Sequence, residues 1–192
     1  MAKASYIALL SRRREGKTDY RTRKGIIISK ENFLTFRISN KNTTVQLSSA
    51  QVGGDRILAS AHSRELKKIG WRGSGKSIPA AYLTGLLAGQ RASKAGLKRA
   101  IVYAGIKPLR PASRMAAAVK GVIEAGIAVP VNEKALPPED RIKGEHISDY
   151  ASSVGESGGE QFSNWKKSKL TAETFGKHYD EILSKIKGGK QS

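Results

Sequence analysis

Residues 77–89, SIPAAYLTGLLAG, combine a helix start with an apolar helical face. Ser77 is a preferred N-cap residue, and Pro79 suits the first turn, where its missing N–H is not needed. Small residues repeat at every fourth position of this stretch: Ala81, Gly85 and Gly89. We therefore predict a buried helix that ends near Ser93 and, because its side chains are small along one stripe, lies close against a sheet.

On the C-terminal side of this helix, apolar runs alternate with a second helical pattern. Residues 100–105, AIVYAG, form the short continuous apolar run that is typical of a buried parallel strand. Residues 112–125 have helical periodicity after Pro111, and residues 127–131, IAVPV, form a last strand with an edge position or an early end at its proline. This alternation predicts parallel strands joined by crossover helices.

On the N-terminal side, three strand patterns precede the helix. Residues 33–38, 43–47 and 56–61 are β-rich, and the turn-forming residues between them predict consecutive antiparallel strands. A short helix follows, with Ser63 as its N-cap and Gly70 as its end. The order β-β-β-α-β-α-β, with this small helix inserted before the large one, predicts an α/β fold: a three-layer α/β/α arrangement with a mixed sheet.

The chain divides into three parts by composition. We expect a basic arm at residues 1–24, the α/β core at residues 25–132, and a C-terminal appendage with a basic tail at residues 133–192. Within the last part, residues 145–152 have a helical pattern and residues 154–161, VGESGGEQ, are typical of a linker. Four aromatic residues are candidate anchors for the tail: Phe162, Trp165, Phe175 and Tyr179.

Charge dominates the composition. The chain carries 35 Lys and Arg against 16 Asp and Glu, a net charge of +19 at pH 7. Nucleic acid is therefore the leading partner class, and an anionic membrane surface the second. Residues 110–160 hold more acidic than basic residues, whereas the other parts have a basic excess, which favours one polyanion-binding side over an evenly charged surface.

The same composition bears on location. Zero cysteines exclude a disulfide scaffold and a thiolate metal site. The longest apolar run, residues 78–88, is shorter than the roughly 20 residues of a membrane span, and the N-terminal charges follow a very short apolar piece, the reverse of a secretory signal. We expect a soluble intracellular protein without a membrane partner.

The arm interleaves cations with one aromatic ring and lacks an apolar face. Guanidinium groups bind phosphates through two parallel hydrogen bonds, and guanidinium or tyrosine planes stack on unpaired bases. The alternative is a disordered, solvated tail. Because arginine outnumbers lysine, we favour an RNA-bound arm with these contact residues: Arg12, Arg13, Arg14, Lys17, Tyr20, Arg21, Arg23 and Lys24.

Residues 70–77, GWRGSGKS, match the phosphate-binding P-loop pattern G-x-x-x-x-G-K-[ST]. A P-loop requires a buried strand before its first glycine and a Mg²⁺-binding Asp after another strand. Here a charged helical stretch precedes Gly70, and the strand AIVYAG ends in glycine. We expect the loop to contact an RNA phosphate through Arg72 and Lys76, with Trp71 as a stacking surface. The alternative is a flexible connector with Trp71 packed in the core.

Catalytic patterns are absent from the sequence. The first strand carries no carboxylate, so the metal pair of ribonuclease H-type nucleases cannot be assembled. No nucleophile has a recognisable local signature. Three histidines are far apart, and each is better explained as structural or as an RNA contact than as a metal ligand: His62, His146 and His178. We predict no enzyme, no cofactor and no small-molecule substrate.

Six sequence blocks, in order, resemble the archaeal branch of large-subunit ribosomal protein number eighteen. They are RRREGKTDYRTR (12–23), ISNKN (38–42), ASAHSREL (59–66), PAAYLTGLLAG (79–89), EAGIAVPVN (124–132) and GEHISDYA (144–151). The likeness covers residues 12–151, whereas the tail after Gly155 matches no block and its role stays open.

This resemblance implies a cytoplasmic ribosomal protein that binds 5S rRNA, touches 23S rRNA and lies beside ribosomal protein number five in the central protuberance. It also implies a ribonuclease H-like topology without its active site. The arm would bind 5S rRNA, and Asn40 and Lys41 at the hairpin tip would approach the RNA. The contact at residues 71–76 is our inference from charge and glycine content. The alternatives are an architectural DNA-binding protein and, less favoured, a P-loop nucleotidase.

Overall fold

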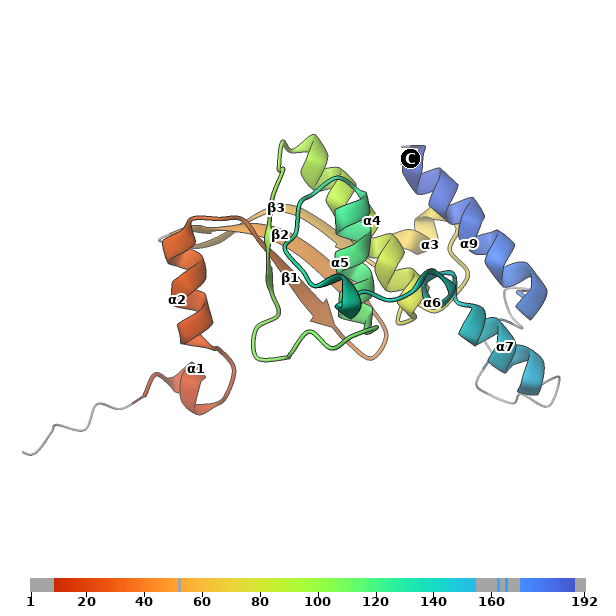
Figure 1. Ribbon diagram of the computed structural model, residues 1–192, viewed down its shortest axis with the longest axis horizontal. Coiled ribbons are helices and arrows are strands. Elements are labelled where there is room, and N and C mark those ends of the chain that lie inside the picture. The colour runs from red at the N-terminus through yellow and green to blue at the C-terminus, as the bar shows by residue number, and fades with distance from the viewer. Residues whose placement is uncertain (1–8, 52, 155–161, 163–164, 166–169, 189–192) are drawn as a thin grey trace, which may run out of the picture.

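The computed structural model describes residues 9–51, 53–154, 162, 165 and 170–188. The molecule is elongated, with the first two helices at one end and the last helices at the other (Figure 1). A twisted sheet and two long helices occupy the middle. This arrangement separates the basic N-terminal segment from the C-terminal helices by the length of the core.

Four strands form one mixed sheet. They are β1 (Phe33–Ile38), β2 (Thr43–Gln51), β3 (Gly54–His62) and β4 (Ile101–Tyr103). Their spatial order is β3-β2-β1-β4. β2 pairs antiparallel with β1 and with β3, whereas β4 pairs parallel with β1. The three antiparallel strands and the parallel addition predicted from the sequence are confirmed.

The register gives the sheet one apolar and one polar face. Leu34 lies opposite Leu47, and both are fully buried among the side chains of the two long helices. The alternate positions bring Thr35 opposite Gln46 and Arg37 opposite Thr44. Since successive residues of a strand point to opposite faces, the polar side chains share the second face. On that face Arg37 is exposed and Thr35, Thr44 and Gln46 are half-buried.

The two long helices in the middle of the molecule are α4 (Ile78–Lys94) and α5 (Arg114–Glu124). Ser77 caps α4 as predicted, with its hydroxyl accepting a hydrogen bond from the Ala80 N–H at 3.3 Å. The small residues of α4 face α5: a Cβ added to Gly85 would overlap the Ala118 carbonyl. The expectation that this stripe lies against the sheet is therefore wrong, because the closest approach is between two helices.

Of the remaining helices, α1 and α2 lie at one end of the core, α7 and α9 lie at the other, and η1 lies beside α5 (Figure 1). Their bounds are α1 (Ser11–Arg14), α2 (Tyr20–Ser29), α3 (Glu65–Ile69), the 3₁₀ helix η1 (Glu133–Ala135), α6 (Glu139–Lys143), α7 (Glu145–Val154) and α9 (Ala172–Lys187). α2 lies against the polar face of the sheet, opposite α4 and α5, which completes the three layers. The expected boundary after Lys24 falls inside α2. The predicted helix at residues 145–152 is present as α7.

The aromatic anchors of the tail are confirmed. Trp165, Phe175 and Tyr179 are buried, and Phe162 is half-buried against the same apolar cluster as α4. Residues 155–161, which belong to the expected linker, lie outside the described residues.

Two local predictions are wrong. Ser63 does not cap the short helix, which follows Arg64; its hydroxyl instead accepts from the Thr43 N–H at 3.1 Å. The last expected strand, residues 127–131, is reduced to a single parallel bridge between Ala128 and Arg99. The next hydrogen bond of this ladder would have to come from the N–H of residue 130. Residue 130 is a proline, which has no N–H, so the ladder ends there.

Candidate nucleic-acid interface

The arm is folded into two short helices by its own polar side chains. Asp19 caps α2, accepting from the Arg21 N–H at 3.0 Å and the Thr22 N–H at 3.3 Å. Hydrogen bonds from the Thr22 hydroxyl and backbone lower the pKa of the Asp19 carboxyl. Arg12 donates from Nε to the Thr18 hydroxyl at 2.8 Å. These contacts shape the arm and still leave most of its cations in solvent.

Most of the predicted arm residues are exposed. Lys17 pairs with Glu15, a contact with limited strength because both side chains are exposed. Within the described part of the chain, no ion pair involves the following cations: Arg13, Arg14, Arg21 and Lys24. They are therefore free to bind an external anion.

Arg23 differs from its neighbours because it points into the protein. Its guanidinium pairs with Asp55 and lies over the Phe33 ring, 5.1 Å from the ring centroid, and 6.0 Å from the Tyr103 centroid. A cation over aromatic rings with a carboxylate partner is a stabilising contact. Arg23 thus fastens α2 to the sheet, and we assign it a positioning role.

A groove of about 550 Å³ runs between the arm and the polar face of the sheet. The arm contributes Arg12, Lys17 and Tyr20, and the sheet contributes Thr35, Arg37 and Gln46. Its one acidic lining residue, Asp55, is paired with Arg23. The groove therefore offers cations, hydrogen-bonding side chains and aromatic rings, including that of Tyr20, the set that suits an RNA backbone and an unpaired base.

A second groove extends this surface toward the hairpin tip. Its lining includes Lys17, Arg37 and Lys107. Arg37 and Lys107 were not among the residues predicted from the sequence. The alternation of β1 contained a signal for Arg37, since it occupies a solvent-facing position between Phe36 and Ile38, but the strand pattern alone does not distinguish a solvated face from a binding face.

The hairpin tip is rigid and basic. The Ser39 hydroxyl accepts from the Asn42 N–H at 2.9 Å, and Arg114 at the start of α5 donates to the Ser39 carbonyl at 3.1 Å. Asn40 and Lys41 are exposed at the end of this turn. The predicted tip residues thus lie on a braced turn and are accessible to a partner.

The glycine loop, residues 70–77, corrects one prediction. Arg72 and Lys76 are exposed as expected, but Trp71 is 3% exposed. Its ring stacks on His178 with centroids 5.4 Å apart and meets Phe175 edge-on at 5.8 Å. Trp71 therefore has no free face for a base. The burial of Trp71 agrees with the packed position considered as the alternative from the sequence, whereas contacts through Arg72 and Lys76 stay a prediction.

The loop also lacks the geometry of a P-loop. Helix α3, and not a strand, precedes it. Several of its N–H groups are used within the chain: Arg72 N–H donates to His178 Nε2 at 3.1 Å, and Ser77 N–H to the Ser74 carbonyl at 3.3 Å. A nucleotide phosphate would have to replace these contacts.

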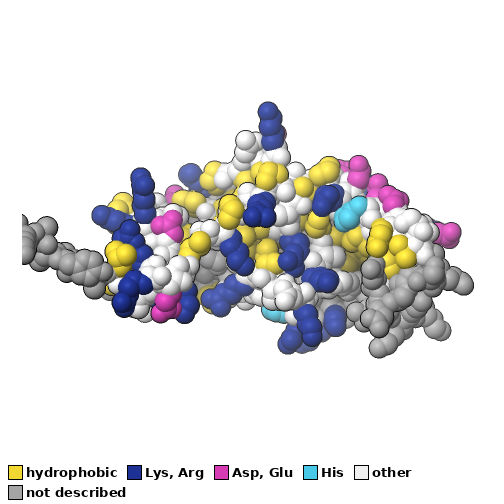
Figure 2. Space-filling view, turned by 90° about the horizontal axis from the view of Figure 1, so that it is seen from below, with side chains coloured by type: hydrophobic (Ala, Val, Ile, Leu, Met, Phe, Trp, Pro, Cys, Tyr) yellow, Lys and Arg dark blue, Asp and Glu magenta, His cyan; other side chains and the backbone are white. Residues whose placement is uncertain are grey.

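Charge is unevenly distributed over the molecule. Seen from below, Lys and Arg side chains extend across the N-terminal end and the middle with a few Asp and Glu among them, whereas at the opposite end Asp and Glu gather along one edge (Figure 2). The grooves and the hairpin tip belong to the basic part. This asymmetry gives the protein one side with a basic excess.

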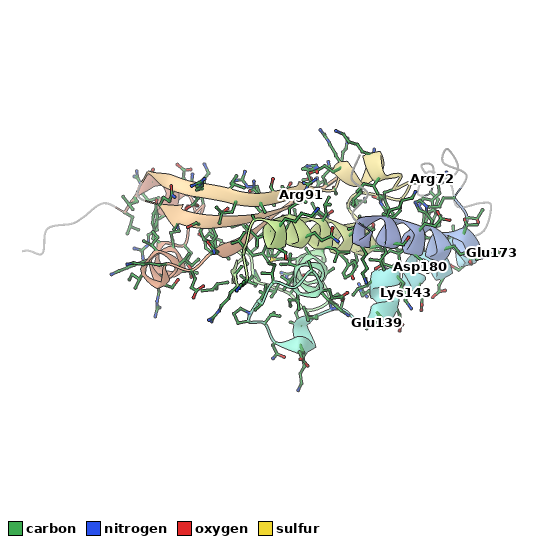
Figure 3. The ribbon with its side chains drawn as sticks, turned by 90° about the horizontal axis from the view of Figure 1, so that it is seen from above. Arg72, Arg91, Glu139, Lys143, Glu173 and Asp180 are labelled. Carbon is green, nitrogen blue, oxygen red and sulfur yellow. The ribbon has the colours of Figure 1, made fainter. Side chains whose placement is uncertain are left out.

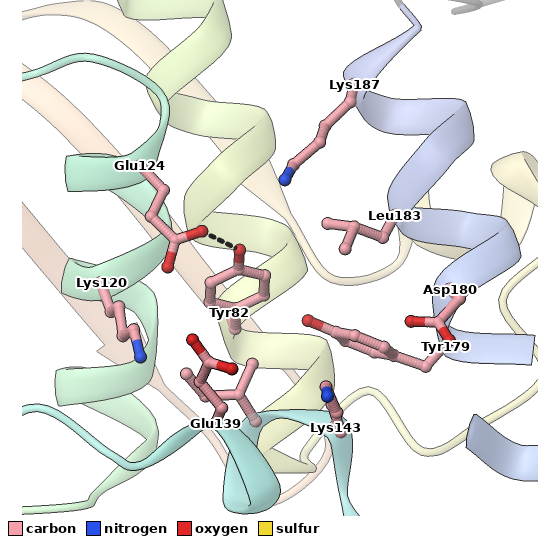
Figure 4. A pocket seen from close by; sticks show the side chains of 10 residues that line it. Tyr82, Lys120, Glu124, Glu139, Lys143, Tyr179, Asp180, Leu183 and Lys187 are labelled. Carbon is pink, nitrogen blue, oxygen red and sulfur yellow. Dashed lines mark hydrogen bonds between the residues drawn. The ribbon is translucent and has the colours of Figure 1, made fainter. Parts of the chain in front are cut away.

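A smaller cavity of about 160 Å³ lies where α9 meets the core (Figure 4). Tyr82 donates its hydroxyl to Glu124 Oε2 at 2.5 Å, and burial raises the pKa of both Tyr82 and Tyr179. Its other lining groups mix lysines with carboxylates, including Lys143 and Asp180. The mixed charges fit a helix junction better than a phosphate site.

Metal sites and membrane-spanning helices were also sought among the described residues. Among the described residues, no three His, Asp or Glu side chains are grouped so that they could hold a metal ion. No described helix has the length and apolar character needed to cross a membrane.

Comparison with known proteins identifies relatives along nearly the whole chain. The family model described as ribosomal large subunit proteins 60S L5 and 50S L18 matches residues 5–100. The large ribosomal subunit protein uL18 of Thermofilum pendens is 43% identical over 192 residues, covering 98% of each chain. That of Methanothermobacter thermautotrophicus is 41% identical over 182 residues, covering 94% of this chain and 95% of the relative.

These matches include the tail that the sequence blocks left open, so the C-terminal helices belong to the shared protein. They also determine the class of function: a structural constituent of the cytoplasmic ribosome and not an enzyme. The chain belongs to the uL18 family of large ribosomal subunit proteins.

Proposed function

We propose that this protein binds 5S rRNA and helps attach it to 23S rRNA in the central protuberance, beside ribosomal protein number five. The observation that carries the proposal is the basic groove between the arm and the polar face of the sheet. Its lining cations come from two separate elements, Arg12 and Lys17 from the arm and Arg37 from β1. The resemblance of residues 12–23 to the family supports the choice of 5S rRNA.

The proposed mechanism combines charge neutralisation with shape recognition. Each Lys or Arg that binds a phosphate releases condensed counterions, which supplies sequence-independent affinity. Tyr20 at the start of α2 lines the groove and is half-buried, so its ring is held in place when a base reaches it. Stacking on aromatic and guanidinium planes is a common means of recognising unpaired RNA bases.

The remaining partners follow from the proposed position in the ribosome. Contacts to 23S rRNA require cations outside the arm, and exposed ones at the hairpin tip and glycine loop include Lys41, Arg72 and Lys76. The acidic end of the molecule, which includes α6 and α7, is a poor surface for RNA and a better one for a protein neighbour.

The test is a binding measurement on the purified full chain with three nucleic acids: 5S rRNA, an unrelated RNA of equal length, and duplex DNA. Dissociation constants are measured over a series of salt concentrations. We expect binding to 5S rRNA to persist at salt concentrations that release both competitors. Equal affinities that fall together with salt would overturn the proposal and favour an architectural DNA-binding protein.

A further inference from the structure

The glycine loop is held between two distant parts of the chain. On one side lies α9, whose His178 accepts the Arg72 N–H. On the other side lies the hairpin tip. Figure 3 shows α9 between the loop that carries Arg72 and the helix that carries Glu139 and Lys143. The loop therefore depends on a helix that follows it by about a hundred residues.

The contact with α9 is specific. The His178 ring is 8% exposed and stacks on Trp71 at an interplanar angle of 21°. Its Nε2 accepts a backbone hydrogen bond, which requires that nitrogen to be unprotonated. Ile182, one turn further along α9, lies 3.7 Å from the Cβ position of Gly70. Both the start of the loop and the backbone of Arg72 are thus fixed by α9.

The contact with the hairpin tip is equally close. A Cβ on Gly75 would lie 3.2 Å from the Lys41 carbonyl oxygen and 3.2 Å from Asn42 Oδ1, which leaves no room for a larger residue without movement. Asn42 Oδ1 also accepts from the Ser63 hydroxyl at 3.2 Å. The loop and the tip consequently form one surface.

This combined surface is cationic. Neither residues 39–42 nor residues 70–77 include an acidic residue, and three cations are exposed: Lys41, Arg72 and Lys76. The nearby Glu65 is occupied, because Arg91 pairs with it at 2.6 Å. On α9, Glu181 and Lys185 near His178 bring opposite charges that offset each other.

We propose that the tip and the glycine loop form a second RNA-phosphate contact, separate from the arm, and that α9 holds it in shape through His178. His178 is a positioning residue: it holds the backbone that carries Arg72 and does not itself touch RNA. This inference rests on the proposed function and specifies how a second part of the surface is built.

The test combines two changes in a double-mutant cycle on the full chain. Replacing Arg72 and Lys76 with alanine removes two exposed cations. The RNA ligand is 5S rRNA combined with 23S rRNA fragments, and its affinity is measured over a series of salt concentrations. We expect the slope of log affinity against log salt concentration to fall by up to about two units. His178→Phe retains a ring on Trp71 but loses the acceptor, and we expect weaker binding by about threefold to tenfold with unchanged net charge. His178→Gln retains a carbonyl acceptor and should restore affinity.

The combined variant separates positioning from general damage. If His178 acts through the loop, His178→Phe will weaken binding little further once Arg72 and Lys76 are removed. Full additivity, or wild-type binding by the Arg72 and Lys76 variant, would overturn the inference. Thermal melts of the RNA-free variants check that each is folded. A wild-type protein without preference for 5S rRNA would instead refute the proposed function, which keeps the two failures apart.

Discussion

The two terminal segments of the chain both have a basic excess in sequence, but the helices that they form, α2 and α9, are built differently. α2 buries only Ile26, and its neighbours Ile27 and Ile28 are exposed. α9 buries a complete stripe consisting of Phe175, His178, Tyr179, Ile182 and Ile186. Positive charge alone therefore does not separate a partner-binding arm from a helix that builds the fold. The spacing of apolar residues does, because only α9 has them at helical intervals.

The largest effect that would sharpen this comparison is expected at Phe175. Its fully buried ring packs face to face on Trp165 with centroids 5.0 Å apart and edge-on against Trp71. Phe175→Ala should lower the free energy of unfolding by about 3–5 kcal/mol. Urea denaturation measures the change. An unchanged midpoint would mean that α9 is not part of the cooperative core.

The next effect is expected in the arm and concerns binding. Replacing Arg12, Arg13 and Arg14 with alanine should leave stability nearly unchanged and lower the salt slope for 5S rRNA by up to about three units. Between 50 and 200 mM salt, a change of three units means that the wild type would lose about sixtyfold more affinity than the variant.

A charge-matched control for the arm lies at the far end of α4. Lys94, Lys98 and Arg99 are exposed and do not line either basic groove. Their replacement with alanine makes the same change in net charge. If this control flattened the salt slope as much as the arm variant, only the total charge would matter and the assignment of the arm would fail.

An adjacent pair of cations tests the comparison within α2. Arg23→Ala removes the contact with Asp55 and the Phe33 ring and should cost about 1 kcal/mol of stability. Lys24→Ala should leave stability unchanged and reduce the salt slope by about one unit. The reverse pattern, measured by the same melts and titrations, would show that Arg23 is the RNA contact.

The smallest effect is expected from pH. Burial, and then the nearby Arg72 cation, lower the pKa of His178 from its usual 6.5. The unfolded chain therefore binds this proton more readily, so the stability contributed by neutral His178 is complete above pH 6.5 and decreases as pH falls below it. His178→Gln should flatten the pH dependence of the melting temperature between pH 7 and 5.

A histidine control is needed because the pKa of His146 is shifted in the same direction as that of His178. Burial also lowers the pKa of His146. His146→Gln should remove a separate part of the pH dependence and leave that of His178 intact. If His178→Gln changed nothing while His146→Gln removed the whole slope, His178 would not be neutral in the fold for the reason given.

Local sequence signals predicted the elements better than their partners. The N-cap at Ser77 and the strand at residues 33–38 depend on nearby residues, and both are observed. The partner of the small-residue stripe of α4 and the burial of Trp71 depend on α5 and α9, which follow much later in the chain. A period identifies the buried face of a helix but does not say what covers it.

The candidate site shows the same division. An exposed, basic arm could be predicted from composition, because no packing contact is needed to place Arg13 or Arg14 in solvent. The inward turn of Arg23 could not, since it depends on Asp55 and Tyr103 from other strands. The polar face around Arg37 required the strand register.

Hydrogen exchange of the full chain, free and with saturating 5S rRNA, tests the central claim most directly. α1 and α2 are short and bury little, so their amides should exchange rapidly in the free protein and slowly in the complex. Amides of α9 should be protected in both states, because the helix is packed before RNA binds. Protection gained by α9 with no change in the arm would contradict this account.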